Sequence, residues 1–222
     1  EYSIFPGDRH KVVAVEIVGN TYFDDDTLRE RMFVTPAQFP RFRRGRFSED
    51  FLRRDANAIR ALYQTNGFRD VQVETKVEDD YDGRDNEQAV LFFVTEGPQW
   101  FVSDLDIEGV ETSTEDDLRA MMQSTEGQPY SDLSVATDQD TILGFFFNNG
   151  YPDATLDVTA TPAAAPNQMV LKYAIRPGER QYVRDVLISG LQTTDAALVR
   201  ERIDLAAGDP LSQSSMIESQ RR

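Results

Sequence analysis

The residues that could do chemistry in this sequence are few, and a dense acidic stretch is the first to consider. Residues 78–87, EDDYDGRDNE, suggest a calcium loop. An EF-hand aligned on Gly83 would need Asp at its first position and Glu at its twelfth, where the sequence has Glu78 and Ala89. A similar stretch further along, PAAAPNQ, has no acid. We therefore interpret residues 78–87 as a hairpin turn with solvated charge, and we predict no metal site.

A second cluster is basic and lies in an otherwise acidic chain. The stretch PRFRRGR holds four arginines, which are Arg41, Arg43, Arg44 and Arg46. One interpretation is a solvated loop between two helices. The other is a contact to anionic lipid headgroups or to an acidic partner, and the sequence leaves both open.

Catalytic and cofactor chemistry have no supporting motif. The only histidine, His10, takes the position that Trp100 and Gln181 take in similar stretches, so we interpret it as a residue of a joint. The sequence has no Ser-His-Asp motif and no glycine-rich phosphate loop. We therefore predict no enzyme activity, no catalytic residue and no cofactor.

Composition sets further limits. The 222 residues carry a net charge of −16, which argues against a nucleic-acid partner because affinity for phosphate comes from lysine and arginine. The absence of cysteine excludes disulfides, thiolate metal ligands and a cysteine nucleophile. The longest stretch of large apolar residues, 142–147, is broken by Gly144 and is far too short to cross a bilayer as a helix.

The elements that must position these residues recur along the chain. LYQTNGFRDV at 62–71 and FFFNNGYPDA at 145–154 each place Asn-Gly between an apolar helical face and an alternating strand. Glycine tolerates a positive φ and commonly closes a helix. Ser48 and Ser131 precede these glycines by 19 residues and are typical N-caps.

A second marker is a pair of glycines twelve residues apart, at Gly7 and Gly19, Gly97 and Gly109, and Gly178 and Gly190. The two markers together predict a unit of strand, helix, helix, strand and strand. The first complete unit is predicted near 12–18, 24–33, 48–66, 69–78 and 88–95. The second is predicted near 101–108, 114–122, 131–149, 154–161 and 168–175, and a third opens with a strand at 182–189.

This order, with VEIVGN, GRFS, NGFRDV and FFVTEGP in place, resembles the polypeptide-transport-associated (POTRA) family. The resemblance implies an α+β fold of tandem POTRA domains, each β-α-α-β-β, with a three-stranded mixed sheet covered by two helices. The predicted boundaries are 1–7 for the final strand of a preceding unit, 8–97 and 98–178 for complete units, and 179–222 for the N-terminal half of a further, truncated unit. The count of at least four units favours a BamA-type array.

The resemblance also implies a function. It indicates the periplasmic arm of an outer-membrane β-barrel assembly protein, on the periplasmic side of the bacterial outer membrane. The implied partners are unfolded outer-membrane β-barrel proteins, accessory lipoproteins of the assembly complex, and the protein's own C-terminal membrane barrel. The alternative is the arm of a TamA-like or two-partner secretion transporter that acts mainly as a structural spacer.

The family sheet order, first, third, second, leaves the second strand of each unit at an edge, where an extended client can add by β-augmentation. The first unit shows a charged row there, Gln72, Glu74, Lys76 and Glu78, which discourages pairing. The second unit shows mainly threonines, which favour strand pairing. We therefore predict that the client-binding edge strand consists of Ala154, Thr155, Leu156, Asp157, Val158, Thr159, Ala160 and Thr161.

Overall fold

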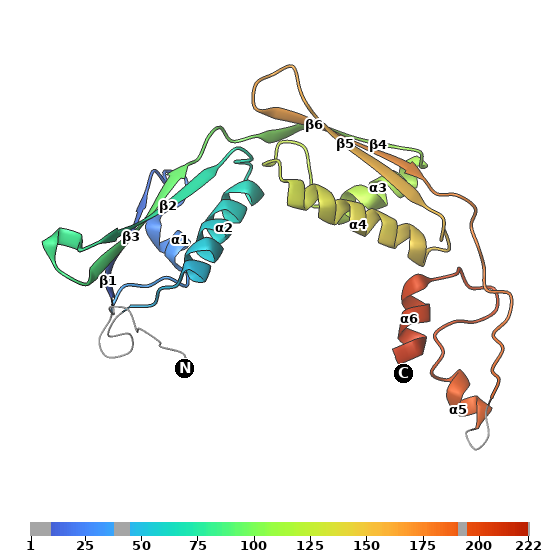
Figure 1. Cartoon of the computed structure of the whole chain (residues 1–222). Coiled ribbons are helices and arrows are strands. Elements are labelled where there is room, and N and C mark those ends of the chain that lie inside the picture. The colour runs from blue at the N-terminus through green and yellow to red at the C-terminus, as the bar shows by residue number, and fades with distance from the viewer. Residues whose placement is uncertain (1–9, 38–44, 191–194, 222) are drawn as a thin grey trace, which may run out of the picture. The chain divides into compact units, whose positions relative to one another are not determined.

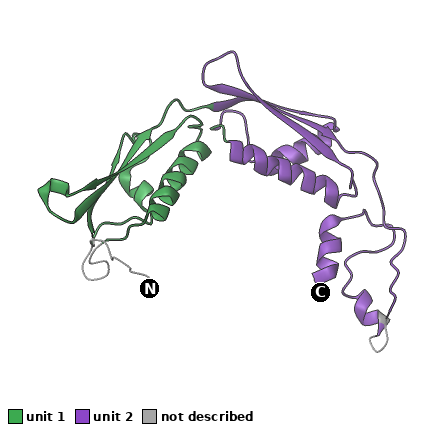
Figure 2. Ribbon diagram, viewed as in Figure 1, with its two compact units in different colours: residues 1–100, 129–131 green, residues 101–128, 132–222 purple. Residues whose placement is uncertain are grey.

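The computed structural model describes residues 10–37, 45–190 and 195–221 (Figure 1). The chain divides into two compact units, which Figure 2 colours separately. Unit 1 comprises residues 1–100 and 129–131, and unit 2 comprises residues 101–128 and 132–222.

Unit 1 has the predicted order of elements. It contains the strands β1 (Lys11–Val18), β2 (Gln72–Asp79) and β3 (Glu87–Thr95), the helices α1 (Asp25–Arg29) and α2 (Glu49–Thr65), and the short 3-10 helix η1 (Tyr81–Gly83). The sheet order is β1-β3-β2, with β1 parallel and β2 antiparallel to β3. Both α-helices lie on the same face of this sheet (Figure 1).

Unit 2 repeats this arrangement. It contains the strands β4 (Phe101–Glu108), β5 (Thr155–Pro162) and β6 (Gln168–Arg176), and the helices α3 (Thr112–Met121), α4 (Asp132–Asn148), α5 (Ala196–Arg200) and α6 (Gln213–Arg221). The sheet order is β4-β6-β5, again with the first strand parallel and the second antiparallel to the last. The α+β fold and the family sheet order are therefore confirmed.

The two cores use matching positions. In unit 1 the most deeply buried apolar side chains come from both helices and the central strand, and they are Leu28, Ile59, Tyr63, Val90 and Phe92. In unit 2 the counterparts are Leu118, Ile142, Phe146, Leu171 and Tyr173. Side chains at helical spacing on α2 and α4 thus meet the inward face of the middle strand, and burial of this apolar area drives each unit to fold.

The local signals that predicted the long helices behave as expected. The Ser48 side chain caps α2 by accepting a hydrogen bond from the Phe51 N–H at 3.1 Å. Gly67 and Gly150 follow α2 and α4 with φ of +91° and +90°. These are left-handed values that an L-residue rarely adopts, so glycine ends both helices.

Two elements differ from the prediction. Helix α1 ends at Arg29 instead of near residue 33, because the Phe33 and Val34 N–H groups donate to a carboxylate of α2 and not to the helix. Residues 183–190 form no strand. In both sheets the first strand pairs only with the last strand of the same sheet. The described residues after 190 contain no strand, so residues 183–190 have no last strand to pair with.

In the described parts of the chain, no helix is long and apolar enough to cross a membrane.

Candidate functional site: the open edge of β5

Strand β5 has a neighbour on one side only, because it stands at the end of the order β4-β6-β5. Its pairing with β6 runs from Thr155 opposite Arg176 to Pro162 opposite Met169. Just beyond the strand, the Ala163 N–H donates to the Gln168 carbonyl at 2.8 Å. This bond sets the phase of the whole antiparallel ladder.

Hydrogen-bonded and non-hydrogen-bonded pairs alternate along such a ladder. Since residue 163 bonds inward, the odd-numbered residues of β5 bond to β6. The N–H and C=O groups of Leu156, Val158 and Ala160 therefore point away from the sheet. Pro162 has no N–H to offer, and it falls at an outward position, where proline is tolerated on an edge.

The odd-numbered residues of β5, whose backbone groups bond to β6, carry side chains that face solvent. Leu156 is buried, whereas Thr155, Asp157, Thr159 and Thr161 are exposed. Asp157 is paired with Arg176 of β6, which also donates to the Thr155 hydroxyl at 3.4 Å. Ala154 precedes the strand and is buried, so seven of the eight predicted residues lie in β5 itself.

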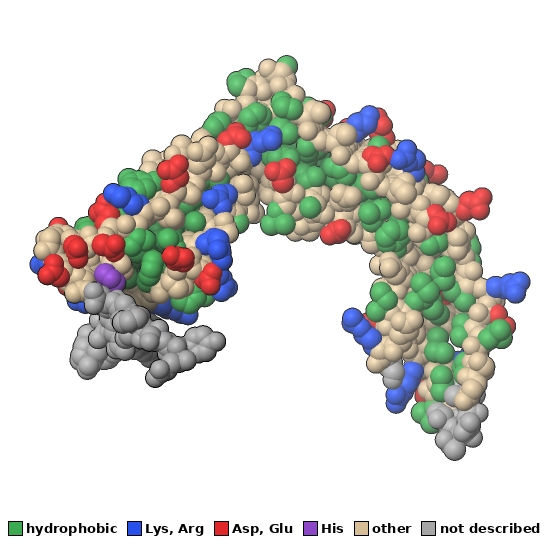
Figure 3. Space-filling view, viewed as in Figure 1, with side chains coloured by type: hydrophobic (Ala, Val, Ile, Leu, Met, Phe, Trp, Pro, Cys, Tyr) green, Lys and Arg blue, Asp and Glu red, His purple; other side chains and the backbone are tan. Residues whose placement is uncertain are grey.

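The corresponding edge of unit 1 is less open. The Arg60 guanidinium of α2 donates to the Val73 carbonyl of β2 at 3.3 Å and so occupies an outward group. Three of the five exposed residues of β2 are charged, Glu74, Lys76 and Asp79, and Lys76 is paired with Glu78 at 2.5 Å. Figure 3 shows acidic side chains over the hairpin that follows β2, whereas the hairpin that follows β5 shows no charged side chain in this view. The exposed residues of β5 thus include one charged side chain, Asp157, where those of β2 include three.

One buried carboxylate in each unit fixes the segment after the first helix, and sequence reasoning missed both of them. In unit 1 the two oxygens of Asp55 accept from Phe33 N–H at 2.8 Å and from Val34 N–H at 2.7 Å. Burial raises the pKa of Asp55, although these two N–H groups act against that rise. The carboxylate thus fixes the end of the first helical segment against α2.

Unit 2 contains the same device. Asp138 of α4 is fully buried and accepts from Gln123 N–H at 2.5 Å and from Ser124 N–H at 2.9 Å. The sequence carried a signal for it, because Asp55 and Asp138 both lie seven residues after the serines that precede the long helices. Ser219, seven residues after Ser212, accepts from Asp204 N–H at 3.0 Å in the same way.

A third carboxylate fastens a loop of unit 1. Glu96 accepts from the Thr21 and Tyr22 N–H groups at 2.6 and 2.8 Å, from the Thr21 hydroxyl, and from the Tyr63 hydroxyl at 2.7 Å. Burial alone would raise the pKa of Glu96, but these hydrogen bonds outweigh it and lower the pKa. Pro177 takes the corresponding position before Gly178, so this contact belongs to unit 1 alone.

The Glu96 contact predicts a pH-dependent stability. The pKa of a glutamate carboxyl is ordinarily 4.5, and folding lowers it here. Such a carboxyl stabilises the folded unit at pH values above 4.5, and this stabilisation is lost as the pH falls through the lowered pKa. Glu96→Gln should therefore destabilise unit 1 at pH 7 and match the parent chain at low pH. Urea unfolding followed by fluorescence of Trp100, with the exposed Glu74→Gln as control, measures this. A difference that is equal at both pH values would contradict it.

The end of α4 explains why the Asn-Gly layout is needed. The Gly150 carbonyl accepts from the Gln181 N–H at 2.6 Å, and the Gln181 carbonyl accepts from the Leu211 N–H at 3.0 Å. A Cβ on Gly150 would lie 2.6 Å from the Gln181 oxygen. Glycine therefore both ends the helix and admits the chain that leaves β6.

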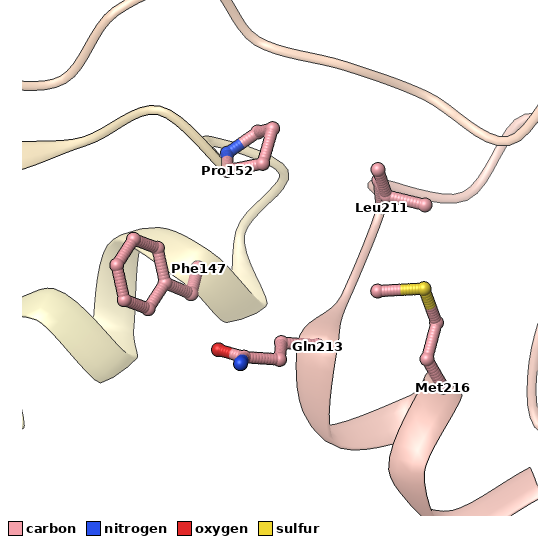
Figure 4. Close-up of a pocket in the computed structure, with 5 residues that line it drawn as sticks. All are labelled: Phe147, Pro152, Leu211, Gln213 and Met216. Atoms are coloured by element: carbon pink, nitrogen blue, oxygen red, sulfur yellow. The ribbon is translucent and has the colours of Figure 1, made fainter. Parts of the chain in front are cut away.

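Beside this contact lies a cavity of about 200 Å³ (Figure 4). Phe147 of α4 and Pro152 face Leu211, Gln213 and Met216 across it. The lining is mainly apolar and open to solvent, and it carries no group suited to acid–base chemistry.

The remaining predicted residues do not gather into a second site. Arg41, Arg43 and Arg44 lie outside the described residues. Arg46 lies over the ring of Phe51, at 4.8 Å from its centroid. Residues 78–87 form the hairpin around η1, and the part of the chain that the structure describes contains no group of three or more potential metal-ligating side chains.

The repeated sheet with its covering helices can be compared with known proteins. Residues 10–97 and 101–178 match the POTRA family model, described as surface antigen variable number repeat. The chain therefore belongs to the POTRA family.

Two relatives and one solved structure illustrate the similarity. The outer membrane protein assembly factor BamA of Neisseria meningitidis is 23% identical over 226 residues, which is 100% of this chain and 28% of that protein. BamA of Nitratidesulfovibrio vulgaris is 26% identical over 183 residues, 80% of this chain and 23% of that protein. The crystal structure of POTRA domains 3–5 of Haemophilus influenzae BamA has a TM-score of 0.57 at 19% identity and covers 96% of this chain and 84% of that one.

The chain spans about a quarter of the length of the curated relatives it matches. Their names and the family match support a tandem POTRA array of BamA type.

Proposed function

We propose that this chain is part of the periplasmic arm of an outer-membrane protein assembly factor, and that it binds unfolded outer-membrane β-barrel clients by strand addition at β5. The observation that carries the proposal is the outward row of backbone groups at Leu156, Val158 and Ala160. Such a row binds an extended segment through main-chain hydrogen bonds with little dependence on side chains. That property suits a receptor for many different client sequences.

The arrangement of the exposed side chains supports the same proposal. A client strand laid along β5 would meet three threonines and one Asp157 whose charge is already paired with Arg176. A client strand laid along β2 would instead meet the charged side chains of Glu74 and Lys76. We further propose that the arm docks accessory lipoproteins, as the resemblance to BamA-type factors suggests, and that it functions as a binding module without catalysis.

Residues 179–222 are proposed to begin a further POTRA unit. The Val183 carbonyl accepts from Gly208 N–H at 2.8 Å, and the Val183 N–H donates to the Asp209 carbonyl at 2.9 Å. Val102 makes the same pair of bonds with Gly127 and Gln128 at the start of unit 2. The repeated loop-to-strand pairing is the support for this boundary.

The test removes one outward N–H from β5 without touching its inward bonds. Ala160→Pro should leave the fold intact, because the residue is exposed and its N–H faces outward. Binding of peptides from several unrelated outer-membrane β-barrels should weaken roughly three- to tenfold for the loss of one hydrogen bond. Titration calorimetry measures the affinity, and circular dichroism measures the fold.

Two controls make the result specific. Ala160→Val changes the same side chain but keeps the N–H, so it should bind like the parent chain. Thr159→Pro deletes an inward bond to β6 and should destabilise unit 2. A folded Ala160→Pro chain with unchanged affinity would refute binding at β5, and a parent chain that binds no peptide would favour a structural spacer.

A further inference from the structure

Each sheet has a second edge, formed by its first strand, and the structure treats this edge differently. In unit 2 the loop before α4 covers the beginning of β4: Val102 donates to the Gln128 carbonyl at 2.9 Å and accepts from the Gly127 N–H at 2.7 Å. In unit 1 the Val12 carbonyl accepts from Ala37 N–H at 2.8 Å. The first outward groups of both strands are therefore occupied by backbone.

Further along each strand a side chain takes over. The Arg119 guanidinium of α3 donates to the Leu105 carbonyl of β4 at 2.8 Å. That carbonyl faces away from β6, since it accepts this bond at the edge. A concavity of about 220 Å³, lined by Leu105, Arg119, Ser124, Thr125 and Glu126, opens beside the contact. The edge is thus approachable at this point, and the guanidinium occupies its hydrogen-bonding position.

The arginine is held in place by an acid one helical turn earlier. Glu115 accepts from Arg119 Nε at 2.9 Å, and its Oε1 also lies 2.9 Å from Nη2, the atom that donates to the carbonyl of Leu105. The acid precedes the arginine by four residues, so both lie on the same side of α3. The guanidinium is therefore aimed at the strand by a contact of its own helix.

Unit 1 repeats the arginine, its acid and the strand carbonyl. Arg29 of α1 donates to the Val15 carbonyl of β1 at 2.8 Å, and Asp25, again four residues earlier, accepts from Arg29 at 3.2 Å. A strand carbonyl at an exposed edge can bond to water without loss, so the fold alone does not require an arginine there. What the arginine adds is occupation of a position that an incoming strand would need.

We propose that Arg29 and Arg119 close the first-strand edges to strand addition, so that each unit offers a client only its second-strand edge. A strand added to β4 would have to displace the guanidinium from Leu105 and separate it from Glu115. Charged groups at strand edges oppose pairing in this way. The proposal deepens the proposed function, since it explains why binding would be confined to β5.

The absence of cysteine from the sequence allows a clean test. Single cysteines are introduced as Asp104→Cys on β4 and as Thr159→Cys on β5, both exposed positions. Each chain is incubated under mild oxidation with a ten-residue peptide of alternating valine and threonine that carries one central cysteine. In the parent background the disulfide should form at residue 159 and hardly at residue 104.

Arg119→Met removes the guanidinium but keeps an unbranched side chain. It should raise the yield at residue 104 on the order of fivefold, the effect of freeing one hydrogen-bonding position, and leave the yield at residue 159 unchanged. Glu115→Gln, which keeps Arg119 but weakens its anchor, should raise the yield at residue 104 to a smaller degree and serves if Arg119→Met does not fold. Arg53→Met is the matched control, because Arg53 is an exposed arginine that pairs with Asp50, an acid of its own helix.

The outcomes separate the two proposals. An unchanged low yield at residue 104 in folded Arg119→Met or Glu115→Gln chains, with normal yield at residue 159, would overturn the role of Arg119 and leave client binding at β5 standing. A high yield at residue 104 in the parent chain would also overturn it. No reaction at residue 159 in the parent chain would count against the proposed function itself.

Discussion

Asp138→Ala should lower the free energy of unfolding of unit 2 by about 2–6 kcal/mol, because it leaves two buried N–H groups without an acceptor at about 1–3 kcal/mol each. The carboxylate of Asp138 is the acceptor for both Gln123 and Ser124, and alanine offers none. For a unit of this size the melting temperature should fall by about 10 °C or more. Thermal unfolding followed by circular dichroism measures the change.

The control for this substitution lies on the same helix. Asp140 is exposed, two residues after Asp138, so Asp140→Ala alters charge and helix propensity without opening a buried bond. Its effect should stay within about 0.5 kcal/mol. Similar losses for Asp138→Ala and Asp140→Ala would show that the buried carboxylate does not hold the end of α3.

Gly109→Ala should be the second strongly destabilising change. Gly109 follows β4 with a φ of +91°, and a Cβ there would lie 1.9 Å from the Ile175 carbonyl oxygen of β6. The methyl group cannot fit unless the ends of β4 and β6 separate. Because the obstacle is backbone, side-chain repacking cannot relieve it, and unfolding of unit 2 should be easier by about 1–3 kcal/mol beyond the cost of the left-handed backbone.

Gly127→Ala isolates that backbone cost. Gly127 has a φ of +80°, but nothing lies within 4 Å of its Cβ position. Gly127→Ala should lower the free energy of unfolding only by the roughly 1–2 kcal/mol that a left-handed conformation costs an L-residue. Chemical denaturation of the two variants side by side gives the difference, and equal stability of the two would show that the strand ends yield to the methyl group.

Several features could be predicted because they depend on neighbours in the sequence. Ser48 and Gly67 mark the ends of a long helix through contacts within a few residues, and the alternation in 155–161 marks a half-buried strand. The recurrence of these signals along one chain also predicts that the units share an architecture. The sheet order came from the family resemblance and not from the residues themselves.

The parts that prediction missed depend on residues far apart in the sequence. The strand expected at 182–189 does not form, since a first strand needs a last strand beside it and local preference alone does not hold it. Helix α1 is shorter than its apolar spacing suggests, because Asp55 takes the N–H groups of Phe33 and Val34.

The candidate site shows the same division. The sequence alone predicted that Thr155, Asp157, Thr159 and Thr161 face solvent, since that follows from a period of two, although Ala160 on the other side is exposed as well. Only the tertiary structure decided which backbone groups face outward, because that phase is set by the pairing of Ala163 with Gln168. It also decided that Arg119 reaches Leu105, a contact between a helix and a strand whose approach no local pattern encodes.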